Sequence, residues 1–405
     1  MSGNRWLIYV LTALFTGACS PRLQPVASSP APVEKPIVKV PEAKPPVKVE
    51  PKVSLISLLL PFDLDYLDKG YNNNAALKKA NIAVDYYQGF KLALDSLTTF
   101  GYNYKLQVYD SKDLPSQAHA LAYNAQIRAS DLIVGPVFPV DIKAFTAVLT
   151  SVRKPIVSPL APASPATFKN RNLVTVNPPL EYHAWAAAGY ITTTLKPKKV
   201  FILKSGYSED NDYLSPFKTA IDSLSKKRIK VNQLTVVHGQ LKVLEPQLSL
   251  TEQNIFIMPS TNQAFLIVTL RTLDSLGKKY PITIFGHPSW KDLTYLKAEL
   301  LQRLKVHITS SENINYKAPE TLSFIRTYRK NYHAEPTVYA IKGFDEGIYF
   351  GKLLADGDDG LKNITRNDFT GMHNSFHFEK KTGLGWINTH VNVYKYSNFA
   401  LKQVK

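Results

Sequence analysis

The side chains that could do chemistry in this sequence are few and widely spaced. His373 and His377 stand four residues apart, a spacing that could bring two imidazoles to one metal ion, but their surroundings have a strand and turn pattern and no carboxylate motif accompanies them. Asp63, Asp65 and Asp68 follow the first apolar run and are typical of solvated loop carboxylates. We therefore predict no metal site and no cofactor.

Catalytic motifs are also missing from the sequence. No G-x-S-x-G, H-E-x-x-H, G-x-G-x-x-G or G-x-x-x-x-G-K-[ST] occurs. Gly347 and Gly351 form a G-x-x-x-G pair, which in a helix that also carries Asp345 and Glu346 indicates close packing. The pattern predicts that the chain is not an enzyme.

The only cysteine, Cys19, indicates the compartment. Arg5 precedes a run from Trp6 to Phe15 that is apolar except for Thr12, and small residues lead from Thr16 to Cys19. This is a secretory signal, because a transmembrane helix needs about 20 apolar residues. The segment resembles a bacterial lipoprotein signal, although that family usually has Leu where Thr16 stands. The resemblance implies a signal peptide over 1–18, lipidation of Cys19 and, with Ser20 after the cysteine, an outer-membrane anchor facing the periplasm.

Residues 19–52 form the next segment. Nine prolines fall between Pro21 and Lys52, with Val, Lys, Glu and Ala between them. Proline removes backbone donors and favours extended chain, so we predict a disordered, Pro-rich tether. A Pro-rich recognition ligand is the alternative.

The net charge of +17 invites a nucleic-acid hypothesis. Arg5 and the tether hold +4 of it, which leaves +13 on 53–405. The body's basic runs, such as Lys226-Lys227-Arg228, follow predicted helices, where cations complement the helix dipole. We therefore predict no nucleic-acid partner; lipid headgroups or cell-wall polymers are the more fitting acidic neighbours.

The remaining chain alternates apolar strands and amphipathic helices. In the first helix Ala83, Tyr87, Phe90, Leu94 and Leu97 recur at spacings of three and four. Strand and helix alternation predicts parallel sheets covered by helices on both faces. We predict strands at 54–60, 104–109, 131–134, 155–158, 199–203, 229–235, 254–258, 281–285, 306–310, 375–379 and 390–396, and helices at 81–97, 116–129, 141–152, 181–195, 215–225, 263–276, 319–332 and 337–354.

The order of several short motifs resembles the type I periplasmic solute-binding proteins of the branched-chain amino-acid (leucine-binding) group, which serve ABC transporters. The motifs are Y87-QGFKLALD, D131-LIVGP, K154-PIVSPLA, K196-PKKVFIL, E335-PTVYAIKGFD and the tail F376-HF with V391-NVY. The resemblance implies two Rossmann-like α/β lobes joined by a three-segment hinge, with lobe 1 at 53–178 and 311–357 and lobe 2 at 179–310 and 358–405. It also implies a ligand in the cleft at the carboxyl ends of the strands.

The resemblance carries the ligand-binding role to loops that follow strands in this sequence. The expected contacts are Pro136, Ser158, Ala161, Ser164, Tyr207, Ser260, Thr261, His287 and Trp290. The alternative is structural: Ser158 and Ser164 could cap a turn or helix, and Trp290 could pack the lobe.

The sequence departs from the family at His287. Amino-acid binders of this group usually have an acidic residue there to pair with the ligand's ammonium, which imidazole cannot replace. We predict a cell-envelope lipoprotein that binds a small polar solute that is not clearly an amino acid. The alternative resembles the outer-membrane lipoprotein activators of penicillin-binding proteins: an interaction protein that regulates a peptidoglycan synthase without a small ligand.

Overall fold

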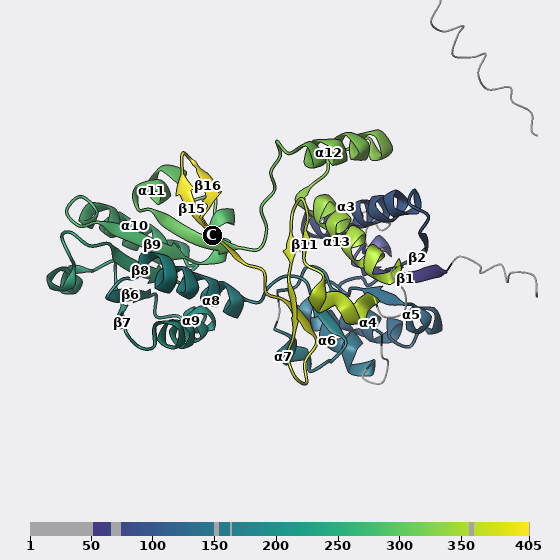
Figure 1. Cartoon of the computed structure of the whole chain (residues 1–405), viewed down its shortest axis with the longest axis horizontal. Helices are drawn as coiled ribbons and strands as arrows, with labels where there is room; N and C mark the ends of the chain where they lie inside the picture. Colours follow the sequence, from purple (N-terminus) through teal and green to yellow (C-terminus); the bar gives the residue numbers. More distant parts are fainter. Residues whose placement is uncertain (1–51, 66–73, 150–153, 163, 356–359, 405) are drawn as a thin grey trace, which may run out of the picture. The chain divides into compact units, whose positions relative to one another are not determined.

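Two seven-stranded sheets organise the chain (Figure 1). The computed structural model describes residues 52–65, 74–149, 154–162, 164–355 and 360–404. The predicted signal peptide, Cys19 and the tether as far as residue 51 lie outside these ranges. In the described ranges, no helix is both long enough and apolar enough to cross a membrane.

The first sheet has the order β13-β14-β5-β4-β3-β1-β2, and all its pairings are parallel except β13 with β14. β1 is buried on both faces because SLISLLL carries apolar side chains on both sides of the strand. The strands are β1 (Val53–Leu60), β2 (Asn103–Asp110), β3 (Leu132–Val134), β4 (Ile156–Ser158), β5 (Leu173–Thr175), β13 (Phe378–Lys380) and β14 (Trp386–Asn388).

Helices cover both faces of this sheet and enclose two apolar clusters. One cluster contains Tyr86, Phe90 and Phe350, and the other contains Ile127, Ile142 and Phe145. The helices of this lobe are α3 (Asn74–Thr98), α4 (Pro115–Leu121), α5 (Ala125–Ala129), α6 (Pro139–Val148), α7 (Pro165–Phe168), α12 (Pro319–Tyr332), α13 (Val338–Ala355) and η4 (Gly360–Arg366).

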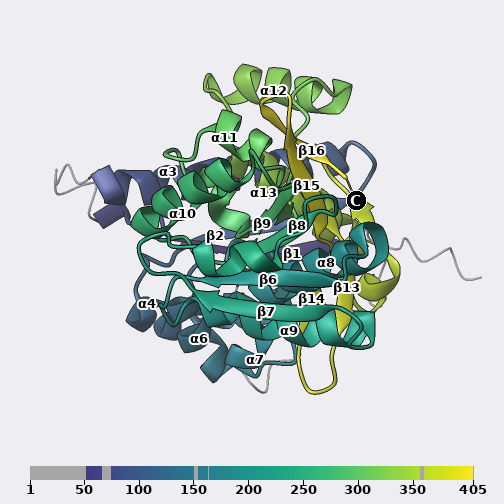
Figure 2. The same cartoon turned by 90° about the vertical axis from the view of Figure 1, so that its left-hand side faces the viewer.

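The second sheet has the order β16-β15-β10-β9-β8-β6-β7. The neighbouring strands β10, β9, β8, β6 and β7 are parallel to one another. β15 and β16 add an antiparallel edge beside β10 (Figure 2). The strands are β6 (Lys199–Lys204), β7 (Lys230–Thr235), β8 (Asn254–Met258), β9 (Ile282–Gly286), β10 (Val306–Ser310), β15 (Asn392–Ser397) and β16 (Ala400–Gln403).

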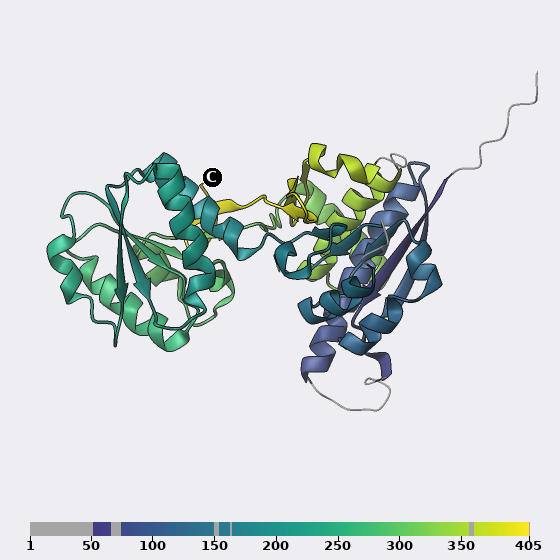
Figure 3. The ribbon, with the colours of Figure 1, turned by 90° about the horizontal axis from the view of Figure 1, so that it is seen from below.

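Helices also flank both faces of the second sheet, as Figure 3 shows in teal and green. They are α8 (Leu180–Tyr190), continued by a π-helical turn η1 (Ile191–Leu195), α9 (Asp210–Ser225), η2 (Lys242–Gln247), α10 (Gln263–Leu276), η3 (Pro288–Asp292) and α11 (Ala298–Arg303). The two parallel-sheet α/β lobes confirm the predicted fold class.

Residues 360–388 belong to the first lobe, whereas the prediction from the sequence places 358–405 in the second. β13 and β14 extend the first sheet through the pairing of β14 with β5. Phe376 and Phe378 also join Tyr349 in the first lobe's core. The chain therefore makes its last crossing after β14, and only β15 and β16 return to the second sheet. The small pair β11 (Phe369–Thr370) and β12 (Ser375–Phe376) precedes β13.

Candidate functional site

The carboxyl ends of both sheets border two neighbouring cavities of about 520 and 310 Å³. Loops after β1, β3 and β4 line them from the first lobe, and loops after β9 and β10 line them from the second. Because they share six lining residues, we treat them as one cleft; the shared residues are Leu160, Pro162, Asn177, Lys291, Asp292 and Glu312.

The first lobe supplies an apolar wall to this cleft. Tyr86 of α3 is fully buried, and Val137 and Phe138 stand between β3 and α6. Leu160 and Tyr339 complete the wall. A solute that enters here meets aliphatic and aromatic surface, the usual lining of a small-molecule site.

Beside the apolar wall, Lys342 of α13 and Asn177 line the cavity and belong to a buried charged network. Lys342 Nζ donates to Asn177 Oδ1 at 2.5 Å and lies 3.6 Å from Glu346 Oε1, while Tyr86 Oη donates to Glu346 Oε2 at 2.7 Å. Burial raises the pKa of Glu346 to about 7, against the opposing charge of Lys342. Asn177 lies on the segment that joins β5 to α8, so the network connects α13 to an interlobe crossing.

Glu312 occupies the second crossing, just after β10. His373 Nε2 lies 3.2 Å from its carboxylate, and Lys291 Nζ lies 4.0 Å away. Burial would raise the pKa of Glu312, but the hydrogen bond from His373 and the charges of Lys342 and Lys291 hold it below its ordinary value. Burial lowers the pKa of His373. The carboxylate is thus already engaged by groups of the protein.

Two histidines of the second lobe face the cleft as neutral side chains. Burial lowers the pKa of His183 and of His287 to about 4. His183 Nδ1 shares a hydrogen bond of 3.1 Å with Thr309 Oγ1. His287 Nδ1 accepts from the Ser289 backbone N–H at 3.1 Å, which leaves the proton on Nε2. His287 therefore offers a neutral N–H donor and no negative charge.

The structure brings some of the expected contacts together and separates others. Ala161 and His287 line the cleft. Pro136 is buried directly before the lining residue Val137. Ser158 is also buried, and its hydroxyl lies 3.5 Å from the Ala161 carbonyl, so it supports the loop from behind.

The other expected contacts lie away from the cleft. Trp290 is 1% exposed, packs against Gly286 and donates from Nε1 to the Ser260 carbonyl at 2.9 Å, which makes both residues part of the lobe's interior. The Thr261 carbonyl accepts from Tyr295 Oη at 3.1 Å. Tyr207 is 57% exposed and lines neither cavity.

Ser164 lines a different, polar cavity. This cavity has a volume of about 1070 Å³ and is also lined by Trp185 and Lys381. The side chain of Ser164 does not cap α7, although the residue stands at its N-terminus.

Several cleft residues were not expected from the sequence. Lys342 lines the cleft and stands four residues before its buried partner Glu346 in a helix otherwise rich in glycine and apolar residues, and this spacing was the available signal. Glu312 and Asn177 gave no such signal, because each acts through a partner distant in the sequence. Among the described residues, no group of three or more His, Cys, Asp or Glu side chains could hold a metal ion.

No protein-family model and no curated protein matches this sequence. Solved structures do match over 87% of the chain. A putative branched-chain amino acid ABC transporter protein from Rhodospirillum rubrum is 14% identical, with a TM-score of 0.64 and 100% of its own length covered. A branched-chain amino-acid transporter protein from Rhodopseudomonas palustris is 15% identical, with a TM-score of 0.59 and 95% coverage.

A substrate-binding protein from Desulfitobacterium hafniense, solved in complex with Leu, is 17% identical, with a TM-score of 0.56 and 100% coverage. At identities this low, the structural similarity shows the fold alone. The chain therefore has the fold of the type I periplasmic substrate-binding proteins of branched-chain amino-acid ABC transporters, the family that its sequence motifs resemble.

Proposed function

We propose that this chain is a non-enzymatic binding protein of the cell envelope that takes a small polar solute into the cleft between its lobes. The observation that carries the proposal is the cleft itself, where loops from the carboxyl ends of both sheets line shared cavities. The fold neighbour from Desulfitobacterium hafniense is an ABC transporter substrate-binding protein solved with Leu, and its binding role supports the proposal.

The cleft favours an uncharged or anionic solute with an apolar part. An amino-acid ligand needs a carboxylate for its ammonium, but His287 is neutral. Glu312 is engaged by His373 and Lys291, and Asp292 pairs with Lys291 at 3.1 Å. The apolar wall of the first lobe suits an aliphatic or aromatic body, and the neutral His287 offers a donor to a carbonyl or carboxylate.

We also propose that Cys19 carries the lipid and that the Pro-rich residues to 52 tether the lobes to the outer membrane. The signal at 1–18 and the proline content support this proposal. The second candidate function is regulation of a peptidoglycan synthase without a small ligand. The absence of an acidic residue at His287 and the long tether favour it.

A thermal-shift panel separates the two functions. The panel pairs each α-amino acid with the acid or amide of the same carbon skeleton that lacks the amino group. Binding to the native state raises Tm by mass action, so we expect a rise for members without the amino group and none for the amino acids. A larger rise for the amino acids would contradict the ligand class. A flat panel together with co-purification of a cell-wall synthase would favour the second function.

A further inference from the structure

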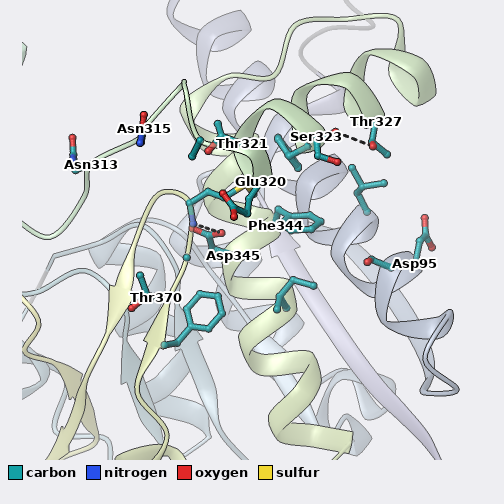
Figure 4. A pocket seen from close by; sticks show the side chains of 18 residues that line it. Asp95, Asn313, Asn315, Glu320, Thr321, Ser323, Thr327, Phe344, Asp345 and Thr370 are labelled. Atoms are coloured by element: carbon teal, nitrogen blue, oxygen red, sulfur yellow. Dashed lines mark hydrogen bonds between the residues drawn. The ribbon is translucent and has the colours of Figure 1, made fainter.

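A large apolar groove of the first lobe lies outside the cleft. It has a volume of about 880 Å³ and runs between α12, α13, α3 and the turn after β11 (Figure 4). Its apolar lining consists of Leu92, Phe324, Phe344, Ile348, Phe369 and Met372. Four of these six side chains remain only partly buried, so the groove continues the lobe's apolar interior out to the surface.

The way α12 packs creates this groove. Its C-terminal half is fixed to α3, where Tyr328 Oη bonds to Gln88 Oε1 at 2.5 Å and Tyr332 Oη donates to the Gln88 carbonyl at 3.1 Å. Its N-terminal half, which bears Glu320 and Phe324, borders the open space instead.

The opposite side of the groove is fixed by Asp345. Its carboxylate accepts from the backbone N–H groups of Met372 and His373 at 3.0 and 2.6 Å, which ties the turn after β11 to α13. The groove therefore has two braced walls, a preformed shape that spares a partner the cost of ordering the site.

The charge of the groove is opposite to that of the protein. The chain carries +17, yet among the described residues that line the groove the only charged side chains are the carboxylates Asp95, Glu320 and Asp345. The Asp345 carboxylate already accepts hydrogen bonds from the backbone N–H groups named above. The Asp95 carboxylate already pairs with Lys91 Nζ at 2.6 Å. Glu320 is exposed and points into the groove in Figure 4.

We propose that this groove docks a segment of a partner protein that carries a lysine or arginine between apolar side chains. The apolar lining of the groove would cover the apolar side chains, and Glu320 would pair with the cation. Polar side chains along the rim, including Asn313, Asn315 and Thr370, are placed to bond an extended peptide backbone. This surface is separate from the solute cleft, so the inference goes beyond the proposed function.

The test uses fluorescence anisotropy with two labelled peptides and the full chain in detergent. One peptide repeats Leu-Lys-Val-Ser three times, and the other replaces each lysine with glutamate. We expect the lysine peptide to bind more tightly by about tenfold or more, and added salt to weaken it, because the pairing is partly exposed.

Variants locate the binding in the groove. Glu320→Lys should weaken the lysine peptide by about tenfold, whereas Asp222→Lys, a matched reversal of an exposed carboxylate on α9, should leave it unchanged. Ile348→Ala shortens one side chain of the apolar lining and should also weaken binding of the lysine peptide. Each variant's Tm confirms that it is folded.

Three results would overturn the proposal. The first is equal binding of both peptides, and the second is equal loss in the Glu320 and Asp222 variants. The third is a concentration-dependent dimer in light scattering that Glu320→Lys abolishes, since the groove would then belong to a second copy of this chain.

Discussion

His183 is a buried neutral base, and this makes stability depend on pH. Burial lowers its pKa to about 4 from an ordinary value near 6.5. The unfolded chain therefore binds more protons than the folded chain between these values. The contribution of His183 is fully present above pH 6.5 and is lost as the pH falls toward 4.

We expect His183→Gln to flatten the acid limb of the stability profile. Between pH 6.5 and 4.5 the loss of unfolding free energy should be smaller than in the wild type by roughly 2 to 3 kcal/mol. Urea unfolding at a series of pH values measures it. Thr309→Val is the matched control, because it removes the hydrogen-bond partner but keeps the imidazole. Parallel profiles for His183→Gln and the wild type would contradict the assignment.

The buried pair of Lys342 and Glu346 gives a second prediction, which concerns the unfolding free energy. Both side chains are buried, at 3% and 0% exposure. Lys342→Met leaves the Glu346 carboxylate without its cation, and we expect a loss of about 3 to 5 kcal/mol in unfolding free energy. In the double variant Lys342→Met/Glu346→Gln, Tyr86 keeps its acceptor and no charge is stranded, so most of the loss should be recovered. Additive losses in denaturant unfolding would show that the two groups are not coupled.

Only some of the side chains that line the cleft could be predicted from the sequence. Ala161 and His287 were placed at the cleft because each follows a recognisable buried strand. Trp290 and Ser260 stand in similar loops but turn inward, bonded to each other. The position of a residue after a strand predicts the edge of the sheet it occupies, whereas the direction of its side chain depends on the packing beneath it.

At the scale of elements, the contact between α3 and α13 depends on glycine. A Cβ on Gly343 would lie 2.2 Å from the Tyr86 carbonyl oxygen, and one on Gly89 would lie 1.8 Å from that of Ala340. The two backbones approach so closely that no side chain fits between them. The apparent G-x-x-x-G pair at Gly347 and Gly351 continues the same face.

We expect Gly343→Ala to separate these helices and to lower the unfolding free energy by about 3 kcal/mol. Gly189→Ala on α8 is the matched control, since a Cβ there meets nothing within 4 Å. It should raise the stability by about 0.5 to 1 kcal/mol through helix propensity. Chemical denaturation of both variants gives the comparison. Similar values for the two would contradict the close-packing account.

Long apolar strands and periodic helices were predictable, and so were the three-residue strands β3 and β4, but two other short strands were not. The strand predicted at 54–60 and the helix predicted at 263–276 match β1 and α10 closely. β5 and β14, with three residues each, were missed. Since β14 joins the first sheet by pairing with β5, missing both strands also placed residues 360–388 in the wrong lobe.

At the scale of the whole molecule, Cys19 should place the lobes at a membrane. We expect labelling of the protein with a palmitate analogue in cells, and loss of the label in Cys19→Ala. A Ser20→Ala variant is the control, because it leaves the cysteine in place. Retained labelling in Cys19→Ala would contradict the lipoprotein assignment.

Isothermal titration of the strongest thermal-shift ligand measures whether the cleft binds a solute. We expect one site per chain in the wild type. His287→Ala should weaken binding by about tenfold or more, because the cleft loses a hydrogen-bond donor. Tyr207→Ala should keep the wild-type Kd, since that side chain lies outside both cavities. An unchanged Kd in His287→Ala, or loss of binding in Tyr207→Ala, would contradict the account.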